Sequence, residues 1–251
     1  MKACPSCPTD RAISTYYSLM PTFHFGHQLG DVVSLAARCP GLTIDEAFRN
    51  PRVTTRELCA LTTPFSIPQQ MLDYGKTCNG FRLRWTVEGP PAGAESPPHQ
   101  DTNLYGGIDL LPLWRIYGAG IGALSHEDRP EEDPRLQCLT IVDYFTNEAI
   151  IGLLHDGQGS LELYYYELTE DLQPLGVDLE GYCRLLKLSL GFMHWQSVLT
   201  DLARLPGPVA NSGYQPGEDA SKQFIEQMPH VDPTFTLEAF LQLYDQVRLR
   251  H

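Results

Sequence analysis

The strongest constraint on the fold is a strictly alternating segment in the first half of the chain. Residues 81–87, Phe-Arg-Leu-Arg-Trp-Thr-Val, place apolar and polar side chains in turn, which is the period of a strand with one buried face. The segment 67–74 before it is typical of a helix that starts at Pro68, and Asn79-Gly80 provides a left-handed stop. We therefore predict a helix that turns sharply into a half-buried strand.

The rest of the chain shows the same two periods, and their order along the sequence predicts the fold class. Helices come first, a run of strands follows and helices come last, without the regular alternation of strand and helix that builds a parallel sheet. We predict an α+β fold, with a single, mostly antiparallel sheet and helices packed on one side of it. The other predicted strands are 108–117, 136–145, 149–155 and 161–168; the other predicted helices are 27–38, 43–48, 55–61, 179–190, 195–205 and 235–247; the predicted loops are 88–107, 125–134 and 206–217.

Proline, glycine and polar tracts divide the chain into three parts. We expect residues 1–26 to form an irregular N-terminal arm, 27–205 to form the α+β domain, and 206–251 to form a linker followed by an amphipathic C-terminal helix. Trp85 and Trp195 fall on apolar faces of their segments. Both indole side chains are therefore expected in the core.

Charge and composition exclude several classes of function. The chain has 31 acidic residues against 18 Lys and Arg residues, a formal charge of -13, and a surface of this sign repels nucleic acid and anionic lipid. No segment reaches the run of about 18 apolar residues that a membrane helix needs, and we expect no secretory signal. The seven cysteines are an odd number, and several lie in apolar segments, which indicates a reducing, cytoplasmic setting. A partner recognised by charge should be basic.

One glycine-rich segment matches a dinucleotide-binding pattern but lacks the helix that such a site needs. Residues 118–123, Gly-Ala-Gly-Ile-Gly-Ala, fit G-x-G-x-x-A, and Asp143 follows at the spacing of a ribose-binding carboxylate. Residues 124–134 contain two prolines and five carboxylates, which do not form a helix that binds a pyrophosphate. We therefore interpret the glycines as a flexible turn and expect no cofactor.

Other catalytic and metal-binding patterns are absent from the sequence or incomplete. Neither the G-x-S-x-G pattern of hydrolases nor the H-E-x-x-H pattern of metalloproteases occurs, so we predict no catalytic residues and no enzyme. Four side chains of the types that bind zinc lie at short spacings, Cys4, Cys7, His24 and His27. A structural zinc site on the arm is one alternative, and free side chains on the arm are the other.

Two aromatic clusters are candidates for contacts with a partner protein. On the last predicted strand, Tyr164 and Tyr166 share one face, and exposed tyrosines combine contact area with a polar hydroxyl. On the C-terminal helix, Phe235, Phe240 and Tyr244 mark the apolar face. The alternative for both clusters is packing inside the chain's own domain, with the C-terminal helix docked either there or into another subunit.

Two sequence motifs resemble a known family. The first motif runs from Ile-Pro-Gln-Gln-Met-Leu-Asp-Tyr at 67–74 to Asn-Gly-Phe-Arg-Leu-Arg-Trp at 79–85, and Pro-Gly-Leu-Thr precedes it at 40–43. The second motif is Tyr-Cys-Arg-Leu-Leu-Lys-Leu-Ser-Leu-Gly-Phe-Met-His-Trp-Gln at 182–196. Both are similar to motifs of the SUKH superfamily, the yeast cell-wall-regulator-like domains, and more narrowly to its tubulin polyglutamylase complex subunit 2 branch. They frame residues 30–205.

The resemblance implies a function in which the chain performs no chemistry. It implies a SUKH-like α+β domain that acts as a non-catalytic adaptor or scaffold subunit of an assembly whose ligase adds glutamates to tubulin tails. The implied partners are other subunits with basic surfaces, and the implied location is the cytoplasm, in association with the cytoskeleton, the centriole or the cilium. Because tubulin tails are acidic, a chain of charge -13 is not expected to hold them by charge.

Two other functions stay open from the sequence. The first is a stand-alone SUKH-type binding module, such as a bacterial immunity protein that blocks a basic toxin, which an acidic surface also suits. The second is an enzyme whose site carries no recognised motif, for example a buried pair of carboxylates.

Overall fold

One sheet organises all the residues that the computed structural model describes, which are 23–87, 104–118, 134–155, 157, 159–167, 171–210, 212–217 and 219–249. Its strands are β1 (Leu42–Arg49), β2 (Phe81–Val87), β3 (Leu104–Leu110), β4 (Leu139–Asp143), β5 (Ala149–Leu154), β6 (Leu163–Glu167) and β7 (Gln173–Pro174). The helices are α1 (Phe25–Ala36), α2 (Thr55–Ala60), α3 (Gln69–Thr77), α4 (Leu113–Tyr117), α5 (Leu179–Ser189), α6 (Gln196–Ala203), α7 (Asp219–Val231) and α8 (Leu237–Val247), together with the 3-10 helix η1 (Pro134–Cys138).

The sheet is antiparallel throughout, and each strand lies beside its neighbour in the sequence, in the order β1-β2-β3-β4-β5-β6-β7. This confirms the predicted α+β fold class. Strands β1, β2 and β3 pair along their whole length, whereas β3 and β4 pair only at Leu110 and Asp143. The segment after α5 occupies the part of the β3 edge that β4 leaves, because the Gly107 amide donates to the Gly191 carbonyl at 2.8 Å.

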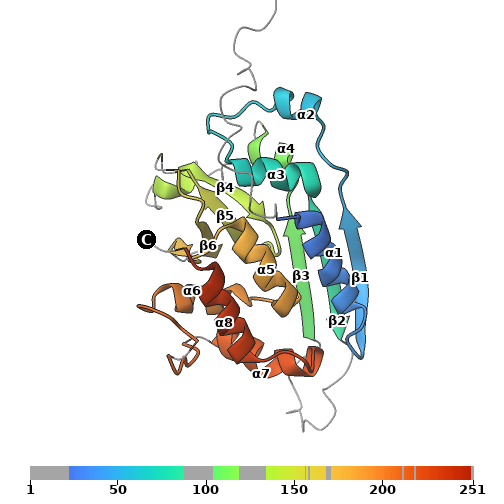
Figure 1. The fold of residues 1–251 in the computed structure, drawn as a ribbon, viewed down its shortest axis with the longest axis vertical. Coiled ribbons are helices and arrows are strands. Elements are labelled where there is room, and N and C mark those ends of the chain that lie inside the picture. The colour runs from blue at the N-terminus through green and yellow to red at the C-terminus, as the bar shows by residue number, and fades with distance from the viewer. Residues whose placement is uncertain are drawn as a thin grey trace, which may run out of the picture.

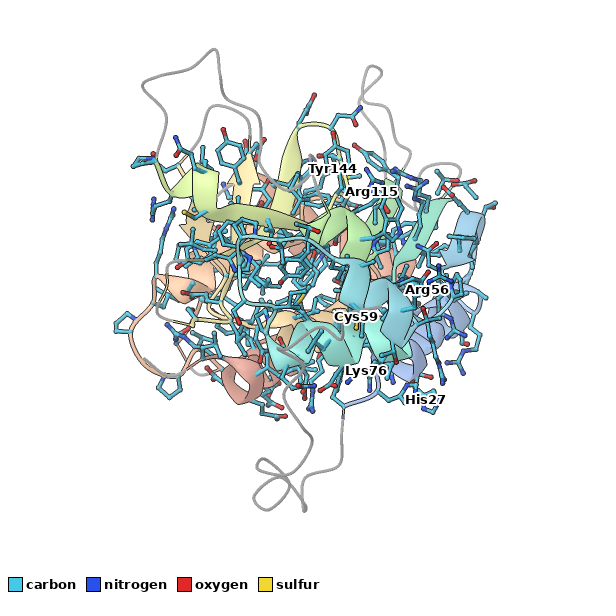
Figure 2. All side chains as sticks on the ribbon, turned by 90° about the horizontal axis from the view of Figure 1, so that it is seen from above. His27, Arg56, Cys59, Lys76, Arg115 and Tyr144 are labelled. Carbon is cyan, nitrogen blue, oxygen red and sulfur yellow. The ribbon has the colours of Figure 1, made fainter. Side chains whose placement is uncertain are left out.

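A layer of helices covers one face of the sheet. Helices α1, α3 and α5 lie over this face, and α8 continues the layer beside α5 (Figure 1). Seen from above, Lys76 of α3 and Arg115 of α4 lie on opposite sides of the molecule (Figure 2). The opposite face of β1, β2 and β3 is therefore the part of the sheet that this helix layer does not cover.

Strand β2 has one buried and one partly exposed face, as its alternating sequence predicted. Phe81, Leu83 and Trp85 are buried and contribute to the core under the helix layer. Arg82 and Arg84 project to the other face. Because a strand alternates the direction of its side chains, the choice of apolar residue at every second position fixes which face of the sheet meets the helices.

Both tryptophans that were predicted for the core lie there. Trp85 and Trp195 are 1% and 0% exposed. The indole N–H of Trp85 donates to the Leu190 carbonyl at 2.7 Å. On the neighbouring strand, a Cβ atom at Gly106 would lie only 2.2 Å from the Trp85 ring, so a glycine is required at this position.

Hydrogen bonds join the first motif to the helix of the second motif. Gln70 of α3 donates to Asp178, the N-cap of α5, at 2.8 Å and accepts from the Leu179 amide at 3.1 Å. The bond from Trp85 to Leu190 holds the C-terminal end of the same helix. The motif residues therefore determine how α3 and β2 pack against α5.

Several predicted elements differ in the structure. Residues 43–48, predicted as a helix, belong to β1, because pairing along the whole of β2 outweighs a local helix preference. The strand predicted at 108–117 ends before Pro112, which begins α4 and has no amide to donate to a sheet. Residues 104–107, predicted as a loop, are the start of β3, and residues 136–138 lie in η1 instead of a strand.

The C-terminal segment contains one helix more than predicted. The described residues of 206–217, which are 206–210 and 212–217, have no helix or strand, as expected of the linker, but α7 follows them. Phe224 of α7 packs edge-on against Phe240 of α8 with ring centroids 5.6 Å apart, and Phe240 in turn packs against Trp195 at 6.1 Å. The two C-terminal helices thus share the core of the preceding segment.

Some predicted features lie outside the described residues. These are residues 1–22 of the arm, 88–103 of the first loop and 119–133, which include most of the glycine-rich segment and the acidic tract. Phe25 and Gly26, the last residues of the predicted arm, already belong to α1.

Candidate functional site

The structure places most of the predicted interface residues in the core. Tyr166, Phe235, Phe240 and Tyr244 are between 0% and 6% exposed, because both faces of β6 are covered and α8 docks on its own domain. Of the two alternatives for the C-terminal helix, the structure therefore shows packing inside the chain. Tyr164 is half-buried near the sheet edge, next to β7.

A different set of aromatic side chains is exposed in the part of the chain that the structure describes. Phe48, Tyr105 and Trp114 are 54%, 49% and 56% exposed. In the sheet register, Phe48 lies opposite Arg82 and Tyr105 lies opposite Thr86, so both project from the face away from the helix layer. The aromatic–arginine surface, as we call it, consists of Phe48, Arg82, Arg84, Tyr105, Trp114 and Arg115.

A bulge in β1 sets the direction of Phe48. The register shifts between Ile44 and Glu46, which leaves Asp45 as an extra residue in the strand. Because side chains alternate along a strand, one extra residue moves Glu46 and Phe48 from the helix side to the opposite face. A regular strand would turn Phe48 toward the core.

Ion pairs on this surface occupy its carboxylates. Arg82 contacts Asp109 at 2.7 Å and Glu46 at 3.4 Å, and Arg84 lies 3.9 Å from Glu46. The hydrogen bond that Arg82 donates to the Asp109 carboxylate raises the pKa of Arg82 above its ordinary value, so this guanidinium stays charged. Arg115 forms no ion pair with any described residue. Among the described residues, no carboxylate accepts a hydrogen bond from Arg84 or Arg115, so both guanidinium groups retain donors for a ligand.

Trp114 stands between two hollows. The first, of about 270 Å³, is bounded by Phe48, Arg82, Asp109 and Arg115 as well as by Trp114 itself. The second, of about 330 Å³, has a mostly apolar lining and lies between Trp114 and helix α2. A large exposed ring with a hollow on each side is a shape that a side chain of another polypeptide can pack against.

This surface could not be predicted from the sequence, and the reason is topological. Phe48 lay in a predicted helix, Tyr105 in a predicted loop and Trp114 in a predicted strand. Only the pairing of β1 and β3 with β2, and the start of α4 directly after β3, bring them to one face. No local pattern in the sequence contains that information.

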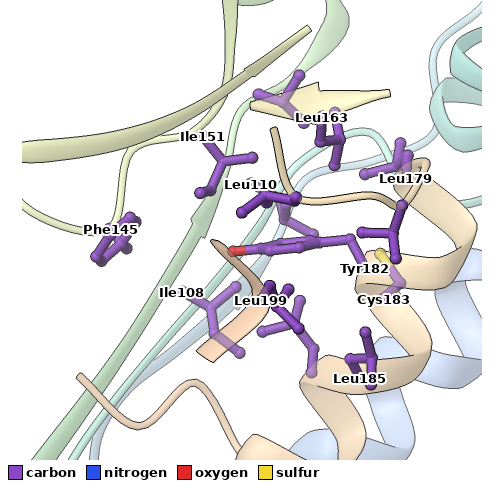
Figure 3. Packing of buried hydrophobic residues seen from close by; sticks show 14 of the residues in the cluster. Ile108, Leu110, Phe145, Ile151, Leu163, Leu179, Tyr182, Cys183, Leu185 and Leu199 are labelled. Atoms are coloured by element: carbon purple, nitrogen blue, oxygen red, sulfur yellow. The ribbon is translucent and has the colours of Figure 1, made fainter. Parts of the chain in front are cut away.

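A buried chain of hydrogen bonds crosses the core. Tyr182 donates to Asp143 at 2.8 Å and accepts from the side chain of Gln196 at 3.0 Å, while the Asp109 amide donates to the other oxygen of Asp143 at 2.8 Å. Burial raises the pKa of Asp143 to about 7. The Tyr182 ring lies among apolar side chains such as that of Leu110 (Figure 3). Asp143 and Tyr182 are 0% exposed, so this hydrogen-bonded group lies inside the core.

Another hollow lies at the other end of the sheet, and its charged groups serve the fold. It has about 880 Å³ and borders Tyr164, Asp245 and Arg248. Asp245 accepts from the Val209 amide at 2.8 Å, and Arg248 donates to the Leu205 carbonyl at 2.7 Å. These bonds fix the turn after α6, so the groups are engaged before any ligand arrives.

Of the four candidate zinc ligands, His24 and His27 lie among the described residues. Cys4 and Cys7 lie outside the described residues. The rings of His24 and His27 stack with centroids 3.9 Å apart, and Nδ1 of His24 accepts from the His27 amide at 3.2 Å at the start of α1. Among the described residues, no three His, Cys, Asp or Glu side chains meet at one point suited to a metal ion. Within the same ranges, no helix has both the length and the apolar character to cross a bilayer.

No protein-family model matches the chain, and no match was found among the curated proteins or the solved structures. The resemblance to the SUKH superfamily therefore rests on the first and second motifs. In the structure their aromatic and amide residues, Gln70, Trp85, Tyr182, Trp195 and Gln196, lie in or border the core.

Proposed function

We propose that the chain is a non-catalytic adaptor that holds partner proteins through the aromatic–arginine surface. The observation that carries the proposal is the gathering of Phe48, Tyr105 and Trp114 beside arginines on the sheet face opposite the helix layer. Aromatic and arginine side chains are enriched at the centres of protein–protein interfaces. An exposed apolar cluster on a folded domain favours a docking site over bare solvent contact.

The assembly that we propose for this adaptor is a tubulin polyglutamylase complex. The two motifs support it, since residues such as Gln70, Trp85 and Gln196 form the mutual contacts that define a packing arrangement, as shared residues of a fold family do. The formal charge of -13 suits partner subunits with basic surfaces elsewhere on the molecule. The proposed setting is the cytoplasm, near the cytoskeleton, centriole or cilium.

The second candidate is a stand-alone SUKH-type binding module, such as a bacterial immunity protein that blocks a toxin. The acidic charge favours it, because a nuclease toxin has a basic surface that binds nucleic acid. The two candidates differ in the protein that binds: a glutamate ligase with its other subunits in the first, and a single toxin in the second.

Affinity capture followed by mass spectrometry tests both the function and the surface. The tagged wild-type chain should recover a glutamate ligase from its own cells, and the double variant Phe48→Ala/Trp114→Ala should lose it. Lys76→Ala on α3 is the control, because Lys76 lies on the opposite side of the molecule from the surface (Figure 2). Recovery of a toxin would favour the second candidate, and a double variant that keeps every partner would exclude the surface as the docking site.

A further inference from the structure

We infer that the aromatic–arginine surface binds an acidic polypeptide segment. Carboxylates of the segment pair with Arg84 and Arg115, and one of its apolar side chains enters the hollow between Phe48 and Trp114. The inference rests on the proposed function, since it assigns a chemistry to the partner that docks on this surface.

The local charge of the aromatic–arginine surface differs from that of the whole chain. The chain carries -13, yet this surface presents three arginines, while its carboxylates Glu46 and Asp109 are already in contact with Arg82 or Arg84. Glu46 and Asp109 are therefore not free to pair with a basic partner. A planar guanidinium matches the two oxygens of a carboxylate, so Arg84 and Arg115 are suited to Glu and Asp side chains.

A hollow lies beside these guanidinium donors. Its volume of about 270 Å³ is several times the roughly 30 Å³ that one water occupies, so it admits a side chain. Phe48 and Trp114 line the hollow with apolar rings. Arg82 and Asp109, also in its lining, form an ion pair that carries no net charge. An acidic segment with one large apolar residue satisfies both the donors and the hollow at once.

Single-stranded nucleic acid is the competing ligand for arginines next to aromatic rings. A polyphosphate chain carries a charge on every unit and extends over more of the molecule than this surface covers. It would meet the repulsion of the surrounding acidic protein at -13, whereas a short acidic peptide places its few charges on the arginines. The peptide is therefore favoured, and an oligonucleotide is one arm of the test.

Tryptophan fluorescence of the full chain gives a direct readout of binding. Of the three tryptophans, Trp85 and Trp195 are buried, and Trp114 is 56% exposed and sits in the surface. The probe is a synthetic peptide of glutamate and glycine with one central phenylalanine. We expect a saturable blue shift of the emission and weaker binding as the salt concentration rises. The same peptide with lysine in place of glutamate should cause no shift.

Charge reversal separates the surface from general electrostatics. Arg115→Glu should weaken binding of the glutamate peptide by roughly tenfold or more, as expected for the loss of a charge-assisted hydrogen bond. Lys76→Glu changes the net charge by the same amount on the opposite side and should leave the affinity within about twofold. Melting curves of both variants establish that each is folded. Equal weakening by the two substitutions would overturn the inference.

Three further outcomes would also overturn it: no emission shift, equal binding of the lysine peptide, or tighter binding of a single-stranded oligonucleotide. The capture experiment keeps these results apart from the proposed function. If Phe48→Ala/Trp114→Ala still loses the partner while the glutamate peptide fails to bind, the surface is a docking site of a different chemistry. If the double variant loses no partner, the adaptor surface itself is wrong.

Discussion

The environment of Asp143 changes the chemistry of its carboxyl group. It is fully buried, and the Tyr182 hydroxyl and the Asp109 amide donate to its two oxygens. Burial is the largest influence on it and favours the protonated form, which is why its pKa rises to about 7 in spite of these donors. At the scale of single residues, the core is therefore sensitive to pH.

The pH dependence of stability follows from this raised pKa. The folded chain binds the proton of Asp143 more tightly than the unfolded chain, so the contribution is complete below about pH 4 and is lost as the pH rises through about 7. Asp143→Asn cannot ionise. The unfolding free energy of the wild type minus that of the variant should therefore fall by a few kcal/mol across this range, since one pKa unit corresponds to about 1.4 kcal/mol. Urea unfolding at several pH values measures it, and a difference that stays constant would contradict the assignment.

Two glycines give a matched pair of substitutions with opposite expected signs. Gly106→Ala would place a methyl group 2.2 Å from the buried Trp85 ring and should cost about 1–3 kcal/mol of stability. Gly30→Ala in α1 has nothing within 4 Å of the new carbon and should stabilise the helix by about 0.5–1 kcal/mol. Denaturant unfolding of both variants tests this. Equal effects would mean that Trp85 does not define the packing at Gly106.

At the scale of elements, the order α3, β2 and α5 is held by contacts between their ends. Gln70 bridges α3 to the N-cap of α5 through Asp178 and Leu179. Trp85 reaches the carbonyl at the other end of α5. Two attachment points at opposite ends fix both the position and the tilt of the helix.

A double-mutant cycle measures the first of these attachments. Gln70→Ala and Asp178→Ala should each cost about 1–2 kcal/mol, because each leaves a partner unpaired and Asp178 also caps α5. Together they should fall short of additivity by at least about 0.5 kcal/mol. Gln70→Ala combined with Thr236→Ala, the N-cap of α8, should be additive. Additivity in both pairs would show that the bridge carries no energy.

The elements that the sequence predicted well are those whose burial repeats at their own period. The alternation of 81–87 predicted β2, and the helical period of 179–190 predicted α5. Strand β1 was not predicted, because the bulge at Asp45 breaks its alternation. Helix α7 was not predicted, because it contains Pro229. The aromatic–arginine surface could not be predicted, since it depends on strand pairing between distant segments.

At the scale of the whole molecule, the C-terminal helices complete the core. Phe224, Phe240 and Tyr244 are 0% exposed, and the Tyr244 hydroxyl donates to the Leu175 carbonyl at 3.1 Å. A chain that ends at residue 205 would expose this side of the core, including Trp195. We expect the shortened chain to have no cooperative unfolding transition by circular dichroism. A sharp transition near that of the full chain would show that α7 and α8 are an accessory layer.

The central claim is that the aromatic–arginine surface is covered when the chain is in its assembly. Hydroxyl-radical footprinting of the free chain and of the captured complex measures it most directly, because Phe48, Tyr105 and Trp114 are both exposed and readily oxidised. We predict that oxidation of these three side chains falls several-fold in the complex, while half-buried Tyr164, outside the surface, is oxidised equally in both. Unchanged oxidation of Phe48, Tyr105 and Trp114 in a complex that has retained its partner would contradict the claim.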